Sequence, residues 1–266
     1  MKRDRLAVGV VGYGAIGRVV ADSLHRGTVP GADLAAVCTR STVDTLVGRS
    51  VSFEETVERS DLVVECAGHA AVADLGPIVL HAGRDLLVSS LGALADDRVY
   101  AVLRDAGPGR LLFTTGALGG IDLLRAAGLA GPLQRVRLVT TKPPHVLVQD
   151  WMNPEYADWL RAARDPVVVF DGTAREAATR FPRTANVAAA LAFASGGWHC
   201  VEVVVVADPN TERSGHDIEC TSTVGEYRLS IRNRPAPANP ATSAVVPHAL
   251  LRAIGDEVST APWRFQ

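Results

Sequence analysis

Three glycines near the start of the chain have the spacing of a phosphate-binding loop. A G-x-G-x-x-G sequence follows an apolar run at residues 6–11 and opens a helical pattern at residues 15–24. The first glycine allows a tight turn, the second lets a pyrophosphate approach, and the third lets helix and strand pack closely. The free N–H groups of the helix start also attract phosphate. The alternative is a turn kept for packing alone. The predicted dinucleotide contacts are Gly12, Gly14, Ala15, Ile16 and Gly17.

The end of the next predicted strand bears on the choice of cofactor. An NAD-selective site has a carboxylate there that binds the ribose 2′-hydroxyl and repels a 2′-phosphate. Residues 38–41, Cys-Thr-Arg-Ser, contain none, and Asp33 lies at the opposite end of the strand. Arg40 could pair with a 2′-phosphate, with hydrogen bonds from Thr39 and Ser41, or it could be solvated. We expect NAD or NADP to be used.

Three further side chains could carry chemistry. His216 follows a polar loop at the start of a predicted strand, and imidazole titrates near neutrality, as proton transfer requires. It is one of seven histidines, and a structural role is the alternative. Lys142 could pair with a carboxylate or be solvated. Cys66 ends a predicted strand and could be a thiolate nucleophile, but the sequence identifies no base or cation to activate it.

Buried strands alternate with helices over the first 116 residues, which predicts an open, doubly wound parallel sheet with helices on both faces. Ligands of such sheets bind beyond the carboxyl ends of the strands. We therefore expect one cleft there, with Ala67 and Gly68 among the cofactor contacts. The predicted strands are 6–11, 34–38, 62–66, 86–90 and 111–115. The loops expected to line the cleft are 12–17, 39–41, 67–69, 89–93 and 116–120.

The pattern changes after residue 116 to alternating and β-branched strands at 135–141, 201–207 and 218–231, with helices at 174–180 and 187–194. This predicts a second, mixed α+β domain. Prolines at 235, 237 and 240 suggest a linker, and residues 241–258 a helix that returns to the first domain. The predicted division is 1–116, 117–234 and 235–266.

Composition excludes some classes of partner and site. The net charge of −2 over 266 residues gives no reason to expect nucleic acid or an anionic membrane. No apolar segment approaches the ~20 residues of a membrane span, and glycines interrupt the apolar run at the start, so we expect no signal peptide. The four cysteines are widely spaced, which favours free, mostly buried thiols in a reducing cytoplasm and no metal site.

Specific motifs begin at the end of the first domain. Together with GYGAIG and VECAG, they resemble the L-aspartate dehydrogenase family over nearly the whole chain. The resemblance implies NAD(P)-dependent oxidation of L-aspartate to iminoaspartate, which hydrolyses to oxaloacetate and ammonia. It also implies a link to NAD biosynthesis and a homodimer. The motifs are GALGG at 116–120, TKPP at 141–144, FPRTANVAAAL at 181–191, DPNTERSGHDIE at 208–219 and NPATS at 239–243.

The resemblance implies roles for individual residues. His216 would be the catalytic histidine, and Asn186 and the Ala117 backbone would contact the cofactor, although capping alone could explain Asn186. Asn239 and Pro240 read as N-cap and first residue of the last helix, which would put Thr242 and Ser243 in its first turn, near a substrate carboxylate. Plain capping is the alternative. The chain departs from the family pattern at Thr184, where Asn is more common, and at Ala241, where Lys is.

Two other functions remain open. Acylating aldehyde or semialdehyde dehydrogenases also join a dinucleotide-binding domain to a mixed domain, with a nucleophilic cysteine for which Cys66 is the candidate. A non-catalytic nicotinamide-binding regulator would keep the glycine loop and could lose His216 without consequence.

Overall fold

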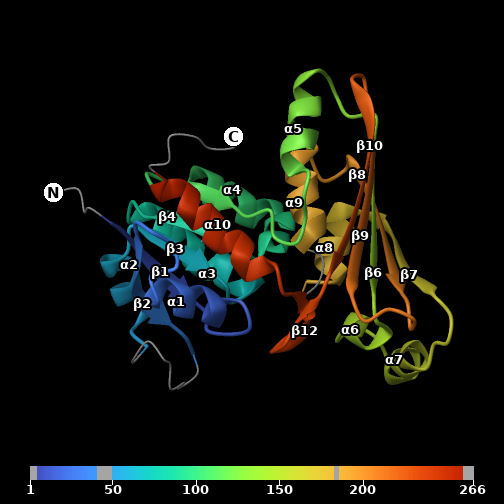
Figure 1. Cartoon of the computed structure of the whole chain (residues 1–266), viewed down its shortest axis with the longest axis horizontal. Coiled ribbons are helices and arrows are strands. Elements are labelled where there is room, and N and C mark those ends of the chain that lie inside the picture. The colour runs from blue at the N-terminus through green and yellow to red at the C-terminus, as the bar shows by residue number, and fades with distance from the viewer. Residues whose placement is uncertain (1–4, 41–49, 183–185, 260–266) are drawn as a thin grey trace. The chain divides into compact units, whose positions relative to one another are not determined.

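The computed structural model describes residues 5–40, 50–182 and 186–259 (Figure 1). The chain forms two compact units. One consists of Met1–Gly116 together with Val246–Gln266, and the other of Ala117–Val245. The second unit is therefore inserted in the sequence between the first five strands and the last helix.

The first unit is built on a sheet of five parallel strands. Their order is β2-β1-β3-β4-β5, so the chain moves from β1 to one side and then crosses to the other. All carboxyl ends share one edge, as in the doubly wound fold, and the predicted parallel sheet is confirmed. The strands are β1 (Leu6–Val11), β2 (Ala32–Cys38), β3 (Leu62–Glu65), β4 (Asp85–Val88) and β5 (Leu111–Phe113).

Helices cover both faces of this sheet. On one face α1 (Gly17–His25) packs against α10 (Val246–Val258), and Val20, Leu250 and Ile254 share a core with Val8 and Val10. On the other lie α2 (Phe53–Arg59) and α3 (His69–His81), followed by the short helix η1 (Leu91–Ala95) and α4 (Asp97–Asp105). The core contains Leu250 and Ile254, so the last helix returns to the first domain as predicted.

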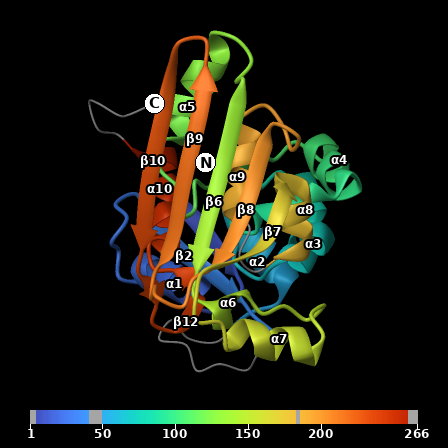
Figure 2. The same ribbon diagram turned by 90° about the vertical axis from the view of Figure 1, so that its right-hand side faces the viewer.

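The second unit is built on a mixed five-stranded sheet in the order β10-β9-β6-β8-β7. β6 and β8 are parallel and the other neighbours antiparallel, which confirms the predicted mixed sheet (Figure 2). The strands are β6 (Arg135–Lys142), β7 (Val167–Thr173), β8 (Val201–Ala207), β9 (Ser214–Ser222) and β10 (Gly225–Asn233).

Helices α5 (Ile121–Leu129), α8 (Ala174–Arg180) and α9 (Asn186–Ala194) lie together on one face of the second sheet (Figures 1 and 2). Two short helices, α6 (Pro144–Leu147) and α7 (Pro154–Arg161), follow β6 in sequence. On the helix-covered face Leu138 and Ile218 are almost fully buried, whereas β10 alternates between half-buried and exposed residues.

The expected proline-rich linker is wrong. Residues 235–243 form an antiparallel pair, β11 (Pro235–Ala236) with β12 (Asn239–Ser243), and α10 begins only at Val246. The side chain of Asn239 accepts a hydrogen bond from the Ala241 N–H at 3.0 Å. Asparagine closes local turns with this bond as readily as it caps helices, so the sequence signal was ambiguous. Among the described helices, none is long and apolar enough to cross a membrane.

Candidate active site

The glycine loop of the first unit has the geometry of a dinucleotide cradle. Gly12 has φ +95°, a conformation that favours glycine, and its N–H donates to the Cys38 carbonyl of β2 at 2.8 Å. A Cβ added at Gly17 would lie 1.9 Å from the Gly12 carbonyl oxygen, so helix and turn are too close for any side chain. A Cβ at Gly14 would meet nothing within 4 Å. The open side of the loop is therefore at Gly14, where a pyrophosphate needs access.

The two charged residues considered for cofactor choice lie toward opposite ends of β2. Arg40 is exposed just beyond the carboxyl end of the strand. Asp33 lies at the opposite end, where Arg5 donates to its two carboxylate oxygens at 2.6 and 2.8 Å. This ion pair holds the pKa of Asp33 below its ordinary value. Ser41 lies outside the described residues.

The loop after β3 contains three of the predicted residues. Ala67 is exposed, Gly68 is the N-cap of α3 with φ +108°, and Cys66 packs beside the glycine loop, with its Cβ 3.3 Å from the position of a Cβ added at Gly17. Burial, with the nearby charge of Glu65, raises the pKa of the Cys66 thiol well above its ordinary value. A neutral thiol is a poor nucleophile, so this environment disfavours the acyl-enzyme alternative. The expectation of mostly buried thiols is wrong: Cys220 is buried, Cys38 and Cys66 are half-buried, and Cys200 is exposed.

In the second unit, His216 lies on β9, next to the central strand β6 of the sheet. It is directly opposite Thr140 in the pairing of β9 with β6, and its Nδ1 is 3.1 Å from the Thr140 hydroxyl. The side chain is only 1% exposed. Alternate residues of a strand share a face, so Lys142 lies on the same face of β6 as Thr140.

Lys142 is buried at the carboxyl end of β6. Lys142 is 3% exposed, and its ammonium group donates to the Ala241 carbonyl of β12 at 3.0 Å. The alternative of a solvated lysine is therefore wrong. The β11–β12 pair covers this lysine, and that contact joins strands 99 residues apart in sequence.

Burial disfavours the charged form of both bases, and the charge of Lys142 also disfavours the imidazolium of His216. Burial lowers the pKa of Lys142 to about 8. The pKa of His216 is lowered to about 3, mainly by burial and then by the positive charges of Lys142 and Arg232, while Asp217 opposes the shift. In the protein alone His216 is therefore a neutral imidazole at neutral pH, and not the group titrating near pH 7 that its residue type suggests.

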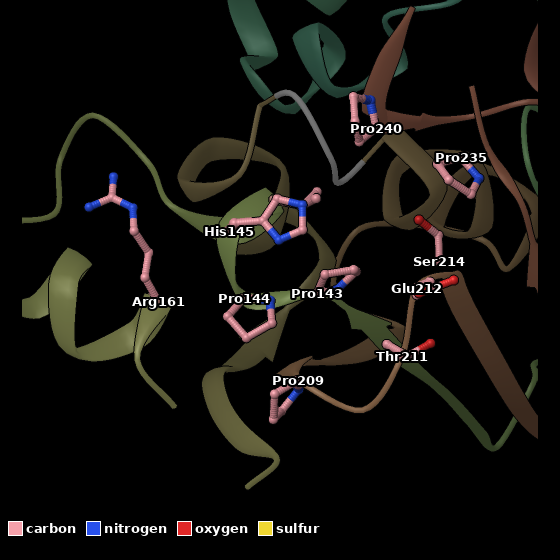
Figure 3. A pocket seen from close by; sticks show the side chains of 11 residues that line it. Pro143, Pro144, His145, Arg161, Pro209, Thr211, Glu212, Ser214, Pro235 and Pro240 are labelled. Atoms are coloured by element: carbon pink, nitrogen blue, oxygen red, sulfur yellow. The ribbon is translucent and has the colours of Figure 1, made fainter. Parts of the chain in front are cut away.

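The second unit contains a pocket lined by residues close in sequence to this pair (Figure 3). Pro143 follows Lys142 directly, Ser214 lies two residues before His216, and Pro240 precedes Ala241. The pocket wall therefore contains residues that are close in sequence to Lys142, to His216 and to Ala241, the hydrogen-bond partner of Lys142. Polar groups on its wall come from His145, Arg161, Thr211, Glu212 and Ser214.

The remaining predicted site residues also belong to the second unit. Asn239, Thr242 and Ser243 lie on β12 rather than at the predicted helix start, because α10 begins only at Val246. The buried Ala117 accepts a hydrogen bond at its carbonyl from the Asn233 amide at 3.0 Å. Asn186 is the first residue of α9, and Thr184 lies outside the described residues.

Sequence reasoning missed two residues that the structure brings to these sites. Thr140 is the hydrogen-bond partner of His216, and its position two residues before Lys142 was the available signal. Glu65 is a buried carboxylate at the end of β3. Its signal was a single acidic residue in the otherwise apolar run LVVEC. Among the described residues, no group of three or more acidic, histidine or cysteine side chains could hold a metal ion.

Comparison with known proteins identifies the family. Residues 122–256 match the family described as aspartate dehydrogenase, C-terminal, and residues 12–108 match the NAD binding domain of homoserine dehydrogenase. The chain is 37% identical to the L-aspartate dehydrogenase of Ruegeria pomeroyi over 263 residues, covering 94% of this chain and 92% of the relative. The chain belongs to the L-aspartate dehydrogenase family. The enzyme of that name from Methanocaldococcus jannaschii is 35% identical over 262 residues, covering 94% and 96% of the two chains.

Solved structures agree with membership of the L-aspartate dehydrogenase family. The aspartate dehydrogenase of Thermotoga maritima matches with a TM-score of 0.71 and 25% identity over 98% of this chain and 100% of the other. A hyperthermophilic archaeal homoserine dehydrogenase in complex with NADPH matches with a TM-score of 0.59 and 12% identity, over 96% and 97% of the two chains, which shows the shared fold. The chain is therefore an oxidoreductase with a nicotinamide cofactor, and neither alternative function is favoured.

Proposed function

We propose that Lys142 and His216 of the second unit bind and deprotonate L-aspartate, and that the glycine loop of the first unit holds NAD(P)⁺. Family membership gives the reaction: L-aspartate and NAD(P)⁺ yield iminoaspartate, NAD(P)H and a proton, and water then releases oxaloacetate and ammonia. The observation that carries the assignment of residues is the buried pair itself. Two adjacent basic groups, each less than 5% exposed, have no structural ion pair to satisfy among the described residues.

The residues of the first unit fit a dinucleotide. Gly12 and Gly17 form a turn too tight for side chains, and Gly14 leaves open space above the start of α1. When bound, the nicotinamide ring supplies the acceptor for the hydride from Cα of the substrate. We assign the backbone of Gly14, Ala15 and Ile16 to the pyrophosphate.

His216 is the proton acceptor in this proposal. If its Nδ1–H donates to the Thr140 hydroxyl, the lone pair of Nε2 is free to take a proton from the substrate ammonium group. The resulting neutral amine can then release the hydride from Cα. An imidazole of pKa about 3 is too weak a base for this step in the empty site. Two substrate carboxylates bound nearby would raise that pKa, because opposite charges favour the imidazolium.

Lys142 is assigned to a substrate carboxylate. Its ammonium group donates to the neutral Ala241 carbonyl, and burial lowers its pKa. A carboxylate would compensate the buried charge and strengthen the hydrogen bond. Asn239, Thr242 and Ser243 are the candidates for further hydrogen bonds, since all three share β12 with Ala241.

We also infer that the enzyme uses both NAD and NADP. Asp33 is paired with Arg5 at the far end of β2, and Arg40 follows the near end, so residues 38–40 offer a cation and no carboxylate to the ribose. Ala117 and Asn186 are assigned to the cofactor by family resemblance, which also supports a homodimer and a link to NAD biosynthesis. The four widely spaced, free cysteines support a cytoplasmic location.

An amination assay tests the reaction. Oxaloacetate with ammonium should cause oxidation of NADH or NADPH, and omission of either should abolish it. Oxidation without ammonium would indicate a hydroxy-acid dehydrogenase instead. The Cys66→Ser variant should keep activity within about threefold, because a neutral buried thiol takes no part. Thioester-dependent activity abolished by this substitution would favour the acylating alternative.

A further inference from the structure

A buried carboxylate lies at the cofactor edge of the first sheet. Glu65 is the last residue of β3 and is 3% exposed. Val63, Val72 and Leu75 line the same small cavity, so its surroundings are mainly apolar. An acidic side chain in such a place is costly unless hydrogen bonds satisfy it.

Four donors from two loops satisfy Glu65. Oε1 accepts from the N–H groups of Ala67 and Gly68, each at 2.7 Å, and from the Ser90 hydroxyl at 3.0 Å. Oε2 accepts from the Ser90 N–H at 2.9 Å. The first two donors belong to the loop between β3 and α3, and Ser90 belongs to the loop between β4 and η1. One carboxylate therefore joins the ends of two neighbouring parallel strands.

The hydrogen bonds fit the ionised form. Burial raises the pKa of Glu65, and all four donors oppose that shift. Three of them are backbone N–H groups, which can only donate, so they are best matched by a carboxylate. Hydrogen bonds to a charged group are also stronger and shorter than neutral ones, as the two 2.7 Å distances illustrate.

The order of the strands indicates which part of a bound dinucleotide these loops would contact. The pyrophosphate belongs at the glycine loop after β1, and the adenosine ribose at the end of β2. β3 and β4 lie on the opposite side of β1 from β2. The loops held by Glu65 are therefore expected to contact the nicotinamide half of the cofactor.

We propose that Glu65 is a positioning residue for the nicotinamide half of the cofactor, acting through the backbone of Ala67, Gly68 and Ser90. This inference rests on the proposed cofactor site. Glutamine at this position keeps the size of the side chain but replaces one acceptor oxygen by a donor NH₂ group. That group would face an N–H donor, and one of the two loops would move.

The test compares the Kd of ADP with the Kd of the reduced cofactor for the same protein. ADP occupies the adenosine half only, whereas NADH and NADPH occupy both halves. In Glu65→Gln the Kd of the reduced cofactor should rise on the order of tenfold, the expected loss for one charge-assisted hydrogen bond, and the Kd of ADP should stay within about twofold. Nicotinamide fluorescence and calorimetry measure these without turnover.

The same chemical change at the other end of the same strand is the matched control. Asp61 precedes β3, and its Oδ2 accepts from the Ala7 N–H at 3.0 Å. Asp61→Asn should change stability and leave both Kd values within about twofold. Ser90→Ala removes only the hydroxyl donor and should weaken reduced-cofactor binding in the same direction as Glu65→Gln, by less.

Equal loss of ADP and reduced-cofactor binding in Glu65→Gln, or no loss of either, would overturn the positioning role. If Glu65→Gln does not fold, unchanged reduced-cofactor binding in Ser90→Ala overturns it instead. The wild-type enzyme separates this inference from the proposed reaction. Cofactor binding without aspartate oxidation would reject the reaction, and the comparison of ligands would still decide the role of Glu65.

Discussion

The Nδ1 atom of His216 lies 3.1 Å from the hydroxyl of Thr140, across two central strands of the second sheet. Because these residues are directly paired in the β6–β9 register, the backbone hydrogen bonds of the sheet hold their distance. The imidazole is thus oriented by a rigid element rather than by a loop. Both side chains are buried, so water does not compete for the bond.

Loss of the imidazole should abolish most of the chemistry. General acid–base groups contribute about 10² to 10⁴-fold in rate, so His216→Ala should lower kcat by that range. The Kd of NADH or NADPH should barely change. His199→Ala is the control, since His199 is exposed in the same unit and should retain wild-type activity. A His216→Ala enzyme within threefold of wild type would remove this residue from the mechanism.

Thr140 should matter only through His216. Thr140→Val keeps the shape of the side chain but removes the hydroxyl, so the imidazole loses the partner that selects its tautomer. We expect kcat to fall on the order of tenfold, in line with the ~1 to 1.5 kcal/mol of a single hydrogen bond. The pH profile of kcat should shift as well, and Thr140→Ser should restore both. A stable valine variant with an unchanged profile would contradict the orienting role.

Lys142 should destabilise the free protein at neutral pH. Its pKa is about 8 when folded and 10.5 as the reference value, so the unfolded chain binds more protons between these values. Stability should therefore rise with pH from about 8 to 10.5, and the cost is fully present below pH 8. Lys142→Met removes the ionisable group and should be more stable at pH 7, by at most about 3 kcal/mol.

The check is thermal unfolding of both proteins at pH 7 and pH 10. The difference in Tm between Lys142→Met and wild type should shrink at the higher pH. A pH-independent difference would mean that the lysine is not titrating in this window. The same variant should also raise KM for L-aspartate, because the proposed carboxylate partner is gone.

Arg40 should control the use of NADP. Arg40→Ala removes the cation proposed to pair with the 2′-phosphate, so kcat/KM for NADP should fall about tenfold or more while that for NAD stays near wild type. Steady-state kinetics with both cofactors measure the ratio. A wild-type preference for NAD above about a hundredfold, unchanged in Arg40→Ala, would contradict dual use.

Local patterns were sufficient for much of the fold and part of the site. The apolar run before Gly12, the glycine spacing and the alternation of strands and helices predicted the parallel sheet, because each depends on short-range periodicity and backbone sterics. The strand at 201–207 and the helix at 174–180 were predicted with the bounds that the structure has. His216 and Lys142 were recognised as candidates from their residue types and motifs.

Their environments depended on contacts that no local pattern contains. Lys142 is buried because residues 239–243 form a strand over it, and the same residues had suggested a helix start. Thr140 meets His216 through a strand pairing 76 residues apart, and Glu65 meets Ser90 across 25 residues. Sequence by itself determined which chemical groups the chain carries and the elements that hold them. Only the tertiary structure decided their burial, partners and charge, because desolvation and pairing are set by residues distant in the sequence.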